Sequence, residues 1–143
     1  MSLLSIIIPA YNEGALIQNT ASVVADIMEK HSIDYEIVFV NDGSKDATWD
    51  EIQKAHRNNE KVCGVCFSRN FGKEGAVFAG LEYAKGDCCV VMDCDLQHPP
   101  ETIIEMYRCI ICGSVDMRSL RVSKQIVVRK ALYIKYLLKC FMA

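Results

Sequence analysis

Two aspartates separated by one residue, Asp93 and Asp95, stand directly after an apolar run that ends at Met92. Carboxylates at this spacing can both bind one hard cation, and Gln97 adds a neutral oxygen. Mg²⁺ or Mn²⁺ is commonly held by one or two carboxylates together with substrate phosphates, so the spacing predicts a divalent metal site at Asp93, Asp95 and Gln97. The alternative is that Asp95 or Gln97 only caps the turn into a helix after Pro99. Two adjacent anions without a cation are unfavourable, which favours the metal site.

Other motifs of phosphate chemistry do not fit this sequence. An Asp-x-Asp pair also opens the haloacid-dehalogenase phosphatase motif, but that motif follows the first strand and continues with Thr or Val. Here the pair follows the fourth apolar run and continues with Leu96 and Gln97. Neither a Gly-x-Gly-x-x-Gly nor a Walker sequence occurs, so dinucleotide-binding and P-loop proteins are excluded.

Polar residues also follow the three earlier apolar runs. Ligands of doubly wound sheets bind outside the carboxyl ends of the strands, so these residues are expected to gather at one edge. A solvated loop does not need such a concentration of carboxylates. The four polar segments are residues 9–13, 41–44, 68–74 and 93–98.

The elements that must position these segments can be predicted from the pattern of apolar residues. Continuous rather than alternating apolarity indicates strands covered on both faces, as in parallel α/β sheets. The four runs of this kind are residues 3–8, 35–40, 62–67 and 88–92. Helical patterns lie at residues 13–30, with Asn12 as N-cap, at 46–57, at 72–84 and after Pro99-Pro100. This alternating order predicts an α/β fold with a doubly wound, mostly parallel sheet.

The composition indicates one folded domain with an acidic body. The 143 residues are 51% apolar and 24% charged, which excludes a disordered chain. Residues 1–113 hold seventeen Asp/Glu against nine Lys/Arg, so we expect no nucleic-acid partner, because phosphate contacts need a basic face. No apolar run reaches the about 18 residues of a membrane span, and the N-terminus lacks a basic signal segment. A cytoplasmic location is therefore expected.

The eight cysteines are expected to be mostly buried thiols, because several lie inside apolar runs. Cys63 and Cys66 form a C-x-x-C pair. Its position in a strand-like run, without a second pair at zinc spacing, argues against a redox or metal role.

The segment 113–143 differs from the body in charge. Residues 114–143 hold seven Lys/Arg and one Asp/Glu, and residues 126–142 mix basic with apolar side chains. This pattern predicts a basic amphipathic C-terminal helix. It could contact an anionic membrane surface, or it could pack on this domain, on a second copy as a homo-oligomer, or on a second subunit. The expected division is a domain of residues 1–112 and a tail of residues 113–143.

The four polar segments, taken together, resemble the motif series of family-2 inverting glycosyltransferases with the GT-A fold. The motifs are Pro9-Ala10-Tyr11-Asn12-Glu13, Asn41-Asp42-Gly43-Ser44, Arg69-Asn70-Phe71-Gly72-Lys73-Glu74 and Asp93-Cys94-Asp95-Leu96-Gln97-His98-Pro99-Pro100-Glu101. The chain is most similar to the polyprenyl-phosphate branch, that is, to dolichol-phosphate mannosyltransferases and bactoprenol glucosyltransferases. The resemblance covers residues 3 to about 108. It implies that residues 1–112 form a nucleotide-sugar-binding half and that the fold is truncated, because relatives continue with an acceptor-binding half.

The resemblance also implies roles for individual residues. Those that bind the nucleotide are Pro9, Tyr11, Glu13, Asp42, Asp93 and Asp95. Asp93 and Asp95 are the catalytic residues and, with Gln97, the metal site, while Arg69 and Lys73 are candidates for contacts with phosphates or sugar. Asp42 is expected to contact the base from a position beyond the core, so that its replacement leaves the fold intact. His98 is either a further ligand or the entry to the next helix.

The implied reaction moves a hexose from UDP-hexose or GDP-hexose to a dolichyl or undecaprenyl phosphate, with inversion. Mg²⁺ or Mn²⁺ is the implied cofactor, and the protein is expected at the cytosolic face of a membrane. A phosphate acceptor is largely ionised at neutral pH, so it does not require a general base. The alternative is a non-catalytic nucleotide-binding or interaction module derived from such an enzyme.

Overall fold

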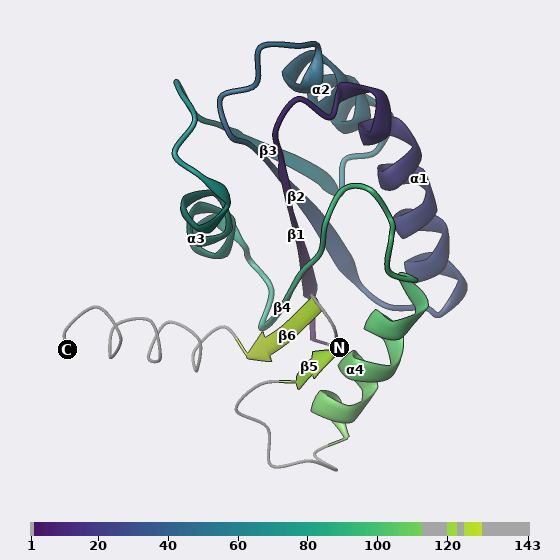
Figure 1. Ribbon diagram of the computed structural model, residues 1–143. Coiled ribbons are helices and arrows are strands. Elements are labelled where there is room, and N and C mark those ends of the chain that lie inside the picture. Colours follow the sequence, from purple (N-terminus) through teal and green to yellow (C-terminus); the bar gives the residue numbers. More distant parts are fainter. Residues whose placement is uncertain (1, 113–119, 123–124, 130–143) are drawn as a thin grey trace, which may run out of the picture.

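In the part of the chain that the structure describes, six strands form one sheet with helices on both faces (Figure 1). The computed structural model describes residues 2–112, 120–122 and 125–129. The strands are β1 (Leu4–Ala10), β2 (Tyr35–Asn41), β3 (Val62–Cys66), β4 (Cys88–Val91), β5 (Leu120–Val122) and β6 (Gln125–Arg129). The helices are α1 (Gly14–Lys30), α2 (Thr48–Asn58), α3 (Lys73–Tyr83) and α4 (Glu101–Ile111).

The first four strands form a parallel sheet, and β1 lies inside it. The strand order is β3-β2-β1-β4-β6-β5. Leu4 of β1 is in register with Tyr35 of β2 on one side and with Cys88 of β4 on the other. The predicted α/β class and the doubly wound, mostly parallel sheet are confirmed, and the four predicted strands and helices form close to their expected bounds.

Both faces of the parallel sheet are covered, which explains the continuous apolar runs. Alternate residues of β1 point to opposite faces, so that Ile6 and Ile8 pack with α1, α2 and α4, whereas Ile7 packs with α3. Figure 1 shows the same arrangement, with α3 on one side of the sheet and α1, α2 and α4 on the other. The connections after β1 and β2 therefore run on one face, and the connection after β3 crosses to the other.

The predicted C-terminal helix is wrong at its start. Residues 126–129 lie in β6, which pairs antiparallel with β4, and β5 pairs antiparallel with β6. Ile126, Val127 and Val128 are β-branched, a residue type that favours strands, and β6 pairs along the edge of β4 opposite to β1. The remainder of the predicted helix, residues 130–142, lies outside the described residues. Among the helices that the structure describes, none is long and apolar enough to cross a bilayer.

The cysteines follow the expectation in part. Cys88, Cys89 and Cys94 are buried, whereas Cys66 is exposed. Cys63 and Cys66 are three residues apart in β3, so they point to opposite faces of the sheet and do not form a chelating or redox pair.

Candidate functional site

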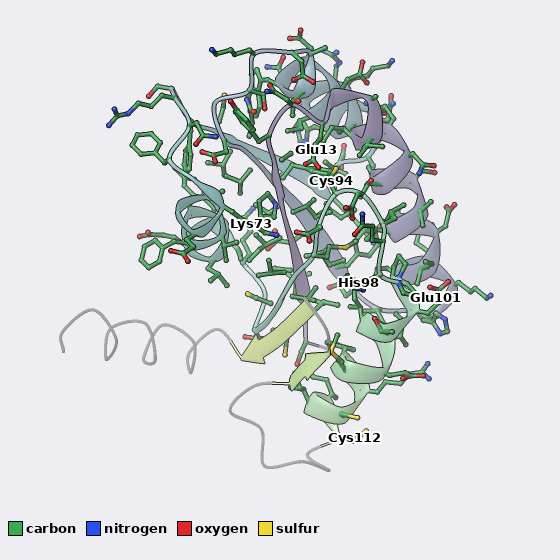
Figure 2. All side chains as sticks on the ribbon, in the orientation of Figure 1. Glu13, Lys73, Cys94, His98, Glu101 and Cys112 are labelled. Atoms are coloured by element: carbon green, nitrogen blue, oxygen red, sulfur yellow. The ribbon has the colours of Figure 1, made fainter. Side chains whose placement is uncertain are left out.

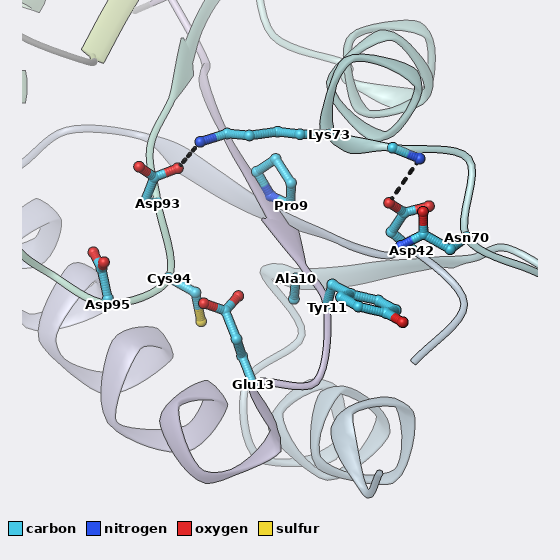
Figure 3. A pocket seen from close by; sticks show the side chains of 11 residues that line it. Pro9, Ala10, Tyr11, Glu13, Asp42, Asn70, Lys73, Asp93, Cys94 and Asp95 are labelled. Atoms are coloured by element: carbon cyan, nitrogen blue, oxygen red, sulfur yellow. Dashed lines mark hydrogen bonds and ion pairs between the residues drawn. The ribbon is translucent and has the colours of Figure 1, made fainter. Parts of the chain in front are cut away.

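A pocket of about 380 Å³ opens at the carboxyl edge of the parallel strands (Figure 3). All four polar segments contribute to its lining, as the sequence predicts. The predicted residues in the lining are Pro9, Tyr11, Glu13, Asp42, Lys73, Asp93 and Asp95. The pocket lies beside the ends of β1 and β4, the neighbouring strands between which the strand order reverses. This is the position at which doubly wound sheets bind ligands.

The loops after β1 and β2 are joined by hydrogen bonds between side chains and backbone. The backbone N–H of Asn12 donates to Ser44 Oγ at 2.9 Å, and Asn12 Oδ1 accepts from the Lys45 N–H at 2.9 Å. The prediction that Asn12 caps α1 is therefore wrong. Its side chain forms a hydrogen bond with the neighbouring loop instead. Its backbone has a φ of 53°, a conformation that Asn tolerates.

The N-terminus of α1 is held by the same neighbouring loop. The Gly14 N–H donates to Asp46 Oδ2 at 3.1 Å, and the Glu13 N–H donates to Thr48 Oγ1 at 3.0 Å. Asp46 Oδ1 also accepts from the Thr48 N–H at 3.0 Å and from its hydroxyl. The Thr48 hydroxyl is the main cause that lowers the pKa of Asp46. These hydrogen bonds hold the segment with Tyr11 and Glu13 against the residues that follow β2.

Asp42 lies directly beyond the end of β2, as expected, but it is buried, which the sequence did not predict. Its residue is 4% exposed, and its two carboxylate oxygens accept from the Phe71 N–H at 2.7 Å and the Gly72 N–H at 3.0 Å. Asp42 therefore ties the end of β2 to the start of α3. It also lines the pocket, and its contact with a base stays a prediction.

Two glycines in these loops have positive φ angles, and one of them, Gly43, stands where the loops approach closely. Gly43 has a φ of 66°, and a Cβ there would lie 2.2 Å from the carbonyl carbon of Arg69. Gly72 has a φ of 95° directly before α3. Both conformations suit glycine, and the contact at Gly43 leaves no room for a side chain.

Three carboxylates line the other side of the pocket, those of Glu13, Asp93 and Asp95. Figure 3 shows the Glu13 side chain pointing toward Cys94. Cys94 stands between Asp93 and Asp95 in the loop after β4. The pKa of Glu13 is raised, chiefly by burial, and the negative charges of Asp95 and Asp93 also raise it. Lys73, the first residue of α3, forms an ion pair with Asp93 across the pocket. The arrangement is an acidic cluster with one ammonium group.

The donor set fits a divalent cation that takes part of its ligands from elsewhere. Among the described residues, no group of three or more His, Cys, Asp or Glu side chains could hold a metal ion. Asp93 and Asp95 supply hard carboxylate oxygens, and Mg²⁺ and Mn²⁺ usually add waters and substrate phosphates to one or two carboxylates. Gln97 is exposed and outside the pocket lining, and its backbone N–H donates to Asp95 Oδ1 at 3.1 Å.

Arg69 and His98 also lie outside the pocket lining. The Arg69 guanidinium stands over the Phe71 ring at 4.7 Å from its centroid. Figure 2 shows His98 beside the start of α4, away from Glu13 and Lys73. This position agrees with a helix-entry residue.

Sequence reasoning gave no role to four residues that line the pocket, Ala10, Asn70, Gly72 and Cys94. All four stand inside the quoted motifs, between residues that were assigned roles. The backbone carbonyl of Cys94 accepts from Thr20 Oγ1 at 2.6 Å, which anchors the loop after β4 on α1. Burial raises the pKa of the Cys94 thiol to about 12, so this cysteine is inert rather than reactive.

The fold is that of a doubly wound α/β protein, and the pocket lies at the switch point of the sheet, where proteins of this class bind ligands. Residues 5–117 match the family described as "Glycosyl transferase family 2". The chain belongs to this family, in agreement with the resemblance of its motifs.

Relatives with named activities are similar over most of the chain. A prophage bactoprenol glucosyl transferase homolog of Escherichia coli K12 is 44% identical over 100 residues, which are 70% of this chain and 33% of the relative. An undecaprenyl-phosphate 4-deoxy-4-formamido-L-arabinose transferase of Aeromonas hydrophila is 35% identical over 126 residues, 87% of this chain and 39% of the relative. The chain spans about a third of the length of these relatives.

Solved structures share the fold. A mannosyltransferase of Pyrobaculum calidifontis in complex with GDP-Man and Mn²⁺ has a TM-score of 0.61 at 22% sequence identity, over 73% of this chain and 31% of that one. This similarity supports the GT-A type of α/β fold.

Proposed function

We propose that this chain is the donor-binding part of a glycosyltransferase that moves a hexose from a nucleoside diphosphate sugar to a polyprenyl phosphate, with inversion. The observation that carries the proposal is the pocket that Tyr11, Lys73, Asp93 and Asp95 line together. Relatives named as bactoprenol and undecaprenyl-phosphate sugar transferases support the acceptor class.

In the proposed reaction, an oxygen of the acceptor phosphate attacks the anomeric carbon of the sugar. The bond from that carbon to the donor diphosphate breaks, and the nucleoside diphosphate leaves with the bonding electron pair. The acceptor phosphate is largely ionised at neutral pH, so no side chain of this chain needs to remove a proton. Attack from the face opposite the leaving group inverts the anomeric configuration.

The chain's own residues bind and orient the donor. Pro9, Tyr11 and Asp42 form the part of the pocket that we assign to the nucleoside, and Glu13 faces the carboxylates beside it. Lys73 is assigned to the diphosphate, because an ammonium at the rim attracts phosphate oxygens. Arg69 is retained as a candidate for sugar or phosphate contacts. We propose the division into residues 1–112 and 113–143 as the donor-binding domain and its tail.

Asp93 and Asp95, with Gln97, are proposed to hold Mg²⁺ or Mn²⁺. A cation bound there supplies Lewis-acid stabilisation of the charge that develops on the leaving diphosphate. Because the acceptor is a membrane lipid, we propose that the protein works at the cytosolic surface of a membrane.

Isothermal titration calorimetry with UDP and with GDP tests the donor site. We expect binding with Mn²⁺ or Mg²⁺, and at least a tenfold loss of affinity in EDTA and in Asp95→Asn. Asp26→Asn is the matched control, because Asp26 is an exposed carboxylate on α1 outside the pocket. Equal affinity with and without metal, or in Asp95→Asn, would remove the metal from the proposed function.

A transfer assay tests the reaction itself. Radiolabelled UDP-glucose and GDP-mannose are incubated with the full chain, Mn²⁺ and undecaprenyl phosphate, and the lipid phase is counted. Labelled lipid supports the glycosyltransferase. Metal-dependent nucleotide binding without labelled lipid would instead favour the non-catalytic nucleotide-binding module.

A further inference from the structure

We infer that Lys73 is an exchangeable counter-ion: its ammonium holds Asp93 while the pocket is without donor and moves to the donor diphosphate when the nucleotide binds. The inference rests on the proposed function, because it assigns the way in which the same pocket takes up metal and nucleotide. Lys73 is a positioning residue in this scheme. It controls how available Asp93 is to a cation.

The ion pair spans the pocket and joins the start of α3 to the loop after β4. Lys73 begins α3, and Asp93 lies two residues after β4, and Figure 3 shows the lysine side chain extended across the pocket toward the aspartate. The Lys73 Nζ contacts Asp93 Oδ1, and the two side chains are 59% and 26% exposed. A pair with this exposure is weak and exchanges readily, because water competes for both partners.

The negative charge around the pocket explains why the Lys73 ammonium pairs with a carboxylate of the proposed metal site. Among the described residues that line the pocket, Lys73 carries the only basic side chain, and it faces four acidic residues. Asp42 already accepts two backbone N–H groups. The lysine therefore compensates the cluster of Glu13, Asp93 and Asp95.

A divalent cation and the Lys73 ammonium compete for the same oxygen of Asp93. A bound diphosphate offers Lys73 a second anionic partner, which releases Asp93. Metal and nucleotide must then each strengthen the binding of the other, because coupling between two ligands is reciprocal. Without donor, the ammonium keeps the carboxylate pair compensated, so that the empty site has a low affinity for the cation.

Mn²⁺ binding to the nucleotide-free protein tests the exchange directly. Free Mn²⁺ is measured by electron paramagnetic resonance with wild type, Lys73→Met and Lys73→Arg. We expect Lys73→Met to bind Mn²⁺ about three- to fivefold more tightly, the effect of removing a partly exposed ion pair. Lys73→Arg keeps the charge and should resemble wild type. Lys54→Met is the matched control, since it removes another surface lysine with a carboxylate partner, Glu51 at 4.0 Å, outside the pocket.

The second measurement is the affinity of wild type and Lys73→Met for UDP and GDP at saturating Mn²⁺. We expect Lys73→Met to bind the nucleotide more weakly than wild type, so that the variant moves the two affinities in opposite directions. A general loss of structure would weaken both. Unchanged or weaker Mn²⁺ binding in Lys73→Met would overturn the inference, and it would leave the proposed function standing if wild type still binds nucleotide with metal. Absence of metal-dependent nucleotide binding in wild type would overturn the proposed function.

Discussion

Replacing Asp42 by Ala is expected to destabilise the domain as well as to alter the pocket. In the structure, the Asp42 carboxylate is buried and accepts the Phe71 and Gly72 N–H groups at 2.7 and 3.0 Å. The alanine variant leaves both N–H groups without this partner. The loop before α3 then loses its hydrogen bonds to the end of β2. The backbone of Lys73, which follows Gly72 directly, is then held less firmly in position.

The size of the effect follows from the two lost hydrogen bonds. A hydrogen bond to a charged acceptor contributes about 1.5–3 kcal/mol. Both N–H groups lie in a part-buried loop where water can replace some of the loss, so we expect the free energy of unfolding to fall by about 3 kcal/mol. A domain of this size is stable by about 5–15 kcal/mol, and a loss of about 3 kcal/mol lowers its Tm by about 10 °C.

Urea and thermal unfolding without nucleotide measure this effect, with Asp26→Ala as the control. Asp26 is exposed on α1, and its replacement should change the free energy of unfolding by less than about 0.5 kcal/mol. Nucleotide affinity is then measured below the Tm of the variant. If Asp42→Ala unfolds like wild type while its nucleotide affinity falls, Asp42 acts only on the base and the structural argument is refuted.

Two further predictions concern the loops that support the pocket. Asp46→Ala should lower the free energy of unfolding by about 1–2 kcal/mol, because Asp46 accepts the Gly14 and Thr48 N–H groups. The pKa of Asp46 is lowered in the folded state, so the difference from wild type is present at pH 7 and shrinks as the pH falls below about 4 and through the folded pKa. Urea titrations between pH 6 and 3 check this, and a constant difference would contradict it. Gly43→Ala should cost more than about 3 kcal/mol, because its Cβ would meet backbone at 2.2 Å, whereas Gly75→Ala, with Phe71 Cβ at 3.5 Å as its nearest contact, should be near neutral. Equal Tm values for the two glycine variants would show that the Gly43 loop can move aside.

The parallel part of the fold could be predicted because its sequence signals are local. The run that became β1 is apolar at successive positions, and its residues divide between the two faces, with Ile6 and Ile7 in different clusters. The gathering of the polar segments at one edge then follows from the direction of the strands. These two steps placed Glu13, Asp93 and Asp95 at one pocket.

The contacts between loops could not be predicted from local patterns. Asn12 looks like a helix cap in sequence, but its partners are Ser44 and Lys45, more than thirty residues away, and they come within reach only because β1 and β2 are neighbours. The hydrogen bond between Asp42 and the Gly72 N–H also joins residues that are thirty positions apart in the sequence. Residues 126–129 fitted a helical pattern in the sequence, but they form a strand because they pair with β4, which lies more than thirty residues earlier in the chain.

The position of β1 has a consequence for the order in which the protein can fold during synthesis. One edge of β1 pairs with β2, which leaves the ribosome soon after it, but the other edge pairs with β4, whose first residue is Cys88. Until β4 has been made, the nascent chain carries an apolar strand with one open edge, a form prone to pairing with other chains. The loops after β1 and β2 can assemble in that interval. Asp93 and Asp95 follow β4 directly, so the acidic side of the pocket is completed in the same step that closes this edge.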